Sequence, residues 1–126
     1  MRLKMCSIHV KDPAAAHTFY TETLGFETLM AMPEHHLFII KDPGADAGSV
    51  GLLLEPSDNP IGADYMNAVY DAGMPAIVFG VPDVQAEFER LVAAGVTFKG
   101  EPSEDPSGIS AVFDDGCGNW VQLHQD

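Results

Sequence analysis

Apolar and polar positions alternate with two different periods along the chain, and the same succession occurs twice. An alternating run over residues 7–12 is repeated over 78–83, and alternation of this kind predicts a half-buried β-strand. Each run ends at an aspartate, and a helical pattern then continues until a glycine, Gly25 or Gly95. Two matching successions in one chain indicate a duplicated structural module.

The residues around the two helical segments agree with this interpretation. Asp12 is a good N-cap and Pro13 suits the first helical position, while Asp83 is the corresponding cap of the second helix. Gly25 and Gly95 can each take the left-handed conformation that ends a helix. An apolar stripe at helical spacing follows each cap. Its members are Ala16, Phe19, Tyr20 and Leu24 in the first helix, and Val84, Phe88, Leu91 and Val92 in the second.

Strand-like segments separated by turns follow each helix, so each module has the order βαβββ. They cover 26–31, 37–41 and 50–55 in the first half, and 96–99, 109–113 and 119–124 in the second. Helical spacing between the halves predicts a linking helix over about 60–73. We therefore expect an α+β fold in one domain, 1–126, with modules at about 1–56 and 74–126.

Charge and cysteine content narrow the range of partners. The net charge is −13, with 19 acidic against 6 basic residues, which argues against nucleic acids and anionic membranes as partners. We expect this charge to form a solvated acidic surface first of all, with attraction of a cationic ligand as the alternative. No apolar run reaches the roughly 20 residues that span a bilayer, and the N-terminus lacks the apolar core of a signal peptide. Two cysteines make no disulfide framework, so we expect a cytoplasmic protein with Cys6 in the core and Cys117 in an accessible turn.

Three stretches of the chain resemble the glyoxalase/bleomycin-resistance/dioxygenase, or vicinal oxygen chelate, superfamily. They are HVKDPAAAHTFYTETLGF at 9–26, VPDVQAEFERLVAAGVTF at 81–98 and DDGCGNWVQLHQ at 114–125. The resemblance implies two βαβββ modules forming a strongly bent, eight-stranded mixed sheet around a cavity, with the helices outside. It also implies a homodimer.

The resemblance further implies four positions for metal ligands in the metal-using members. Counting back from the capping aspartates gives Met5 and Ala76, and aligning the last strand of each module gives Glu55 and Gln122. A thioether and a methyl group match a hard divalent ion poorly. We therefore expect no metal cofactor, with Glu55 as the one ligand-type side chain that remains.

Strand alternation predicts which side chains share the cavity with Glu55, because every second residue points to the same face. Either His35 or His36 could point inward, and we favour His36 together with Phe38. Glu55, at the end of an apolar run, either reaches solvent or is the catalytic or ligand-pairing group. The predicted ligand-binding residues are Ser7, His9, His36, Phe38, Leu53, Trp120, Gln122 and His124.

Three functions are compatible with this pattern. The first is a module that binds a small molecule, cationic or α-carbonyl, without a metal. The second is a lyase or isomerase in which Glu55 acts as a base, with or without a divalent metal. The third is a catalytically silent member of the family. The missing ligands favour the first.

Overall fold

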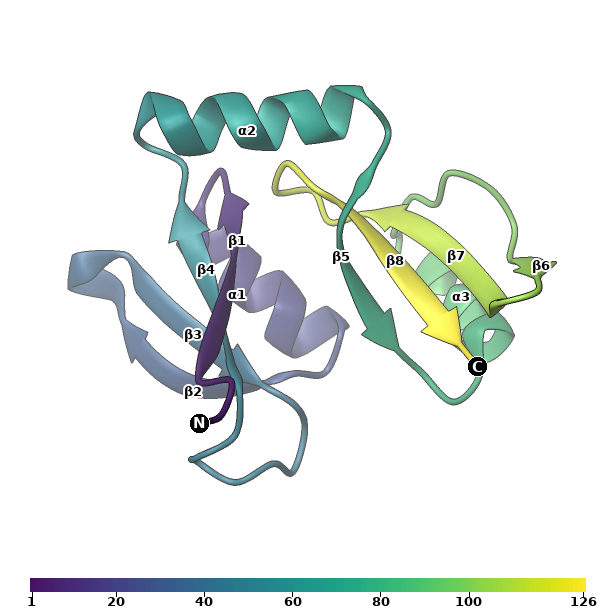
Figure 1. The fold of residues 1–126 in the computed structure, drawn as a ribbon, viewed down its shortest axis with the longest axis horizontal. Helices are drawn as coiled ribbons and strands as arrows, with labels where there is room; N and C mark the ends of the chain where they lie inside the picture. The colour runs from purple at the N-terminus through teal and green to yellow at the C-terminus, as the bar shows by residue number, and fades with distance from the viewer. The chain divides into compact units, whose positions relative to one another are not determined.

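The computed structural model describes residues 1–126, and the chain divides into two compact units, Met1–Met66 and Asn67–Asp126. Each unit holds a four-stranded mixed sheet with a helix against one face (Figure 1). The α+β class and the duplicated βαβββ order are confirmed, with the eight strands divided between two sheets.

The first sheet has the order β1-β4-β3-β2, with β1 and β4 parallel and the other pairs antiparallel. These strands cover Met5–Val10, Gly51–Pro56, Leu37–Lys41 and Glu27–Met32. Helix α1, Pro13–Thr18, continues into a π-helical turn at Phe19–Thr23 and packs on β3 and β4. The core side chains between helix and sheet include Ile8, Val10, Ala16, Tyr20, Phe38, Ile40 and Leu54.

The second sheet repeats this topology as β5-β8-β7-β6. The strands cover Pro75–Gly80, Trp120–Gln125, Gly108–Asp114 and Ser103–Asp105, and helix α3, Val84–Ala93, packs on β7 and β8. The core of this unit includes Val84, Leu91, Ala111, Phe113, Val121 and Leu123.

The two predicted caps begin equivalent helices. The Asp12 carboxylate accepts hydrogen bonds from the amides of Ala14 and Ala15, at 3.1 and 3.2 Å, and Asp83 accepts one from Ala86 at 3.0 Å. These bonds satisfy amide donors that have no partner within the helix itself. The linking segment forms helix α2, Pro60–Asp71, where Asn59 accepts a hydrogen bond from the amide of Gly62.

Two local predictions are wrong. Residues 96–99 form no strand, because Phe98 makes only a single bridge to Phe113. The strand that follows α3 in the second module is the three-residue β6 instead. The predicted exposures of the two cysteines are also reversed, since Cys6 is exposed and Cys117 is buried. Cys6 lies near the start of β1, before the buried part of that strand. Cys117 lies in a turn, where its backbone amide donates a 2.7 Å hydrogen bond to the buried carboxylate of Asp115.

Candidate functional site

Each sheet has a second face that its own helix does not cover, and the paired registers show which residues share it. In the first sheet, Ser7 pairs with Leu53, Leu53 with Ile39, and Ile39 with Met30, so these four side chains form a row across all four strands. We call this surface the open face of the first sheet. Its members are Met5, Ser7, His9, Glu27, Leu29, Met30, Met32, Leu37, Ile39, Lys41, Leu53 and Glu55.

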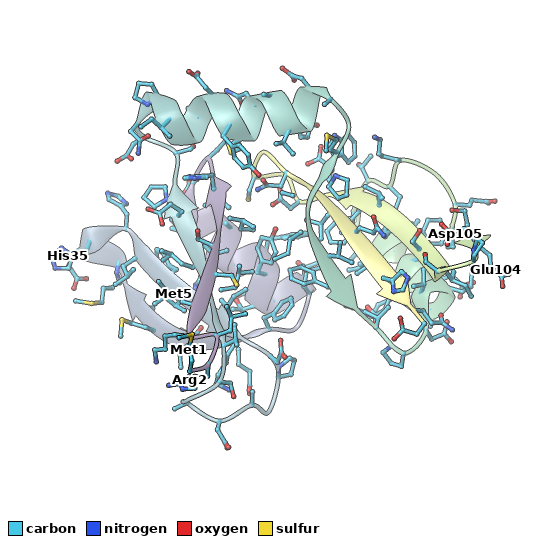
Figure 2. The ribbon with its side chains drawn as sticks, in the orientation of Figure 1. Met1, Arg2, Met5, His35, Glu104 and Asp105 are labelled. Atoms are coloured by element: carbon cyan, nitrogen blue, oxygen red, sulfur yellow. The ribbon has the colours of Figure 1, made fainter.

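The alternation predicted for β1 and β4 agrees with these registers. Ile8 and Leu54 are paired and buried on the helix side, which leaves Ser7, His9, Leu53 and Glu55 on the open face. Met5 is 47% exposed and Met30 46% exposed, so large apolar side chains lie in contact with solvent here. Figure 2 shows Met5 near the start of β1.

The alternation predicted for β3 is wrong. Phe38 is only 4% exposed, and its ring packs against that of His17 of α1 with 4.8 Å between centroids, so it belongs to the core. His36 is not part of the strand at all: it ends a short 3-10 turn, Pro33–His35, in a left-handed conformation with φ of 52°. Both His35 and His36 are exposed in this turn, and Figure 2 shows His35 at the periphery.

His9 and Glu55 are paired on neighbouring strands at the end of the open face nearest to α2. The His9 ring lies against Gly62, where an added Cβ atom would stand 2.7 Å from Nδ1, and it meets Tyr65 edge-on with 6.3 Å between ring centroids. The glycine therefore permits the close approach of imidazole and helix. Glu55 is half-buried, and neither an ion pair nor a hydrogen bond holds its carboxylate.

The open face of the second sheet is more polar. Gln122 pairs with Val78 on one side and Val112 on the other, and Trp120 and His124 point to the same face of β8. The His124 Nε2 donates a hydrogen bond of 3.1 Å to the carbonyl of Ser107, and Nδ1 lies 3.3 Å from Asp126. His124 thus has a role in holding the end of the β6–β7 hairpin.

Trp120 has structural partners on and around its ring. Tyr70 of α2 stacks on it with 5.1 Å between centroids and 7° between planes, and Trp120 Nε1 donates to the Tyr70 carbonyl at 3.2 Å. Lys99 Nζ lies 4.9 Å from the ring centroid and donates to Gly73 O at 2.9 Å. Trp120 thus adds a donor to a carbonyl in the last turn of α2, and Lys99 binds the carbonyl of Gly73 just beyond the helix.

The Tyr70 hydroxyl donates a 2.6 Å hydrogen bond to Asp114. This bond, followed by desolvation, raises the pKa of Tyr70 above its usual value. In the first sheet, the hydrogen bond from Lys41 at 2.9 Å, reinforced by the amide of Gly44, lowers the pKa of Glu27.

The registers also test the four positions that the resemblance implied for a metal. Met5 pairs with Gly51 and Glu55 with His9, so Met5 and Glu55 are four residues apart along the strands, or about 13 Å. Metal–ligand bonds of about 2.0–2.3 Å do not bridge such a gap. Met5 and Glu55 therefore cannot both be ligands of one metal ion.

The residues at these positions do not fit the divalent ion of the metal-using relatives. Met5 and Ala76 supply a thioether and a methyl group, and no group of three or more His, Cys, Asp or Glu side chains is arranged to hold a metal ion. Separately, no helix of the chain has the length and apolar character needed to cross a membrane.

Comparison with known proteins places the chain among others of the same size and fold. YurT of Bacillus subtilis (strain 168), an uncharacterized protein, is 39% identical over 127 residues, covering 99% of both chains. The crystal structure of UcmS2 is 34% identical with a TM-score of 0.78, covering 98% of this chain and 97% of that one.

TnmS3, an antibiotic binding protein from Streptomyces sp. CB03234, is 29% identical with a TM-score of 0.76, covering 99% of this chain and 95% of its own. A family model matches residues 2–123. The chain belongs to the glyoxalase/bleomycin resistance protein/dioxygenase superfamily.

Proposed function

We propose that this protein binds a small organic molecule non-covalently on the open face of its first sheet, without a metal cofactor. The observation that carries the proposal is the row Ser7, Leu53, Ile39 and Met30, which presents apolar side chains to solvent beside the polar groups of His9 and Glu55. A mostly apolar surface with a few placed polar groups is the usual composition of a small-molecule site.

The likeness to TnmS3 supports the same function, because that protein binds an antibiotic and is similar over nearly the whole chain. Ser7, His9, Leu53 and Glu55 are the ligand-contacting residues of the proposal, with Gln122 as a candidate in the second sheet. Phe38 and His36 are excluded from it, because one is core and the other lies in a turn. Homodimerisation and a cytoplasmic location stay predictions.

The test is a fragment screen by protein-observed NMR, followed by titration of the hits. Replacing Leu53 with Gln keeps the side-chain size and makes the centre of the row polar. We expect it to weaken the hits at least tenfold, or about 1.4 kcal/mol. Ile61→Gln is the matched control, because Ile61 is an exposed apolar residue of α2, outside the sheet, at 86% exposure. Equal loss in both variants, or hits that perturb no open-face residue, would refute the proposal.

The lyase or isomerase alternative has one specific observation in its favour, the pairing of Glu55 with His9. A carboxylate base beside an imidazole could remove a proton next to a carbonyl while the imidazole donates to the oxygen. This reaction predicts exchange of α-hydrogens of carbonyl compounds with deuterated water, measured by NMR. The exchange should disappear in Glu55→Gln. No exchange above the buffer rate with any α-carbonyl compound would argue against catalysis.

A further inference from the structure

Charge is distributed unevenly over the open face of the first sheet. At the end near Met5, Lys41 and Glu27 are paired in register and joined by a 2.9 Å ion pair, so their charges are balanced. The central row of Ser7, Leu53, Ile39 and Met30 carries no charge.

Glu55 lies at the opposite end of this face. Its carboxylate forms no ion pair and accepts no hydrogen bond. A half-buried carboxylate beside apolar side chains is partly desolvated, so a cation that reaches it gains more than it would in bulk water. The face therefore has one charge to complement, and that charge is negative.

The spacing of the sheet gives the size of a complementary molecule. The Glu55 position lies two residues beyond the central row, or about 7 Å along the strand, and the row itself crosses three strand spacings, about 14 Å. Met30 has a flexible, polarizable side chain that adapts to different apolar shapes.

We propose that the ligand class of this site is hydrophobic amines, with the apolar body on the central row and the ammonium group on Glu55. The inference rests on the proposed function, since it names the chemistry of the molecule that the same face would hold. It assigns Glu55 the role of counter-ion rather than of metal ligand.

Three probes of the same shape test it: 1-naphthylmethylamine, 1-naphthalenemethanol and 1-naphthoate, which are cationic, neutral and anionic. Each is titrated by NMR into the full chain, into Glu55→Gln and into Glu34→Gln, the last being a control at an exposed turn residue. We expect the amine to bind about tenfold more tightly than the alcohol, and the naphthoate more weakly than both. Glu55→Gln should abolish the difference between amine and alcohol, and Glu34→Gln should preserve it.

The possible failures are distinguishable. If the alcohol binds as tightly as the amine and both perturb Leu53 and Met30, the preference for amines is overturned and the proposed function stands. If an amine preference survives in Glu55→Gln, the counter-ion role is overturned. If no probe perturbs the open face, and sedimentation shows a dimer in which these residues are protected from solvent, the face is an interface between copies and both proposals fail.

Discussion

Replacing Gly62 with alanine should destabilise the protein, although glycine to alanine inside a helix ordinarily stabilises by about 1 kcal/mol. The added Cβ would lie 2.7 Å from Nδ1 and 2.8 Å from Cε1 of His9, distances at which one of the two groups must move. The His9 ring lies between its own strand, β1, and helix α2, and it contacts Tyr65 of that helix edge-on. Overpacking of such a contact costs about 1–3 kcal/mol, which exceeds the gain in helix propensity.

We therefore expect Gly62→Ala to lower the free energy of unfolding by about 1 kcal/mol, measured by urea denaturation. The decisive comparison uses a His9→Ala background, in which the collision is absent and the same substitution should stabilise by about 1 kcal/mol. The two effects then differ by roughly 2 kcal/mol, a coupling that a double-mutant cycle resolves. Gly80→Ala, at the end of β5, is the control for adding a methyl group without a collision, because a Cβ there meets no atom within 4 Å. If Gly62→Ala stabilises equally with and without His9, the close approach of ring and helix is refuted.

Three further outcomes follow from the site and the caps. Maleimide should label Cys6 rapidly in the folded protein and Cys117 only on unfolding; mass mapping that finds Cys117 modified first would contradict the burial of that thiol. Because hydrogen bonding to Asp114 raises the pKa of Tyr70, the stabilisation from that pair should be present below pH of about 10 and lost as pH rises further. Ultraviolet titration should show the Tyr70 ionisation moving to lower pH in Asp114→Asn, and an unchanged titration curve would contradict the hydrogen bond. Asp12→Ala should cost about 1 kcal/mol in thermal unfolding through the loss of two capping bonds, whereas an unchanged midpoint would show that solvent replaces them.

The helical modules were predictable from the sequence because several independent local signals coincide. Asp12 and Asp83 cap, Gly25 and Gly95 have φ of 94° and 90° after the helices, and the apolar stripes agree with both. In β1 the alternation correctly predicted the burial of Ile8 and Val10, but it failed for Cys6, which precedes the buried part of the strand.

Which residues of β3 face the core could not be predicted from a local pattern. Leu37 to Ile40 are all apolar, so periodicity does not choose a face, and the left-handed residue His36 interrupts the extended backbone just before the strand. The position of Glu55 opposite His9 depends on pairing between strands 46 residues apart in sequence, which no local pattern contains. The roles of Trp120 and Lys99 at the end of α2 are long-range for the same reason.

The two sheets share one topology, yet one open face is mainly apolar with a single acidic group and the other presents Gln122, His124 and Ser110. Folding of each unit relies on the opposite side, where Ile8, Leu54, Val121 and Leu123 contact the helices. In the proposed function, ligand recognition and folding thus depend on alternate residues of the same strands. Under the proposed function, variation at Ser7, Leu53 and Glu55 should change the ligand preference at little cost to folding, which makes these three positions suitable for a randomised library.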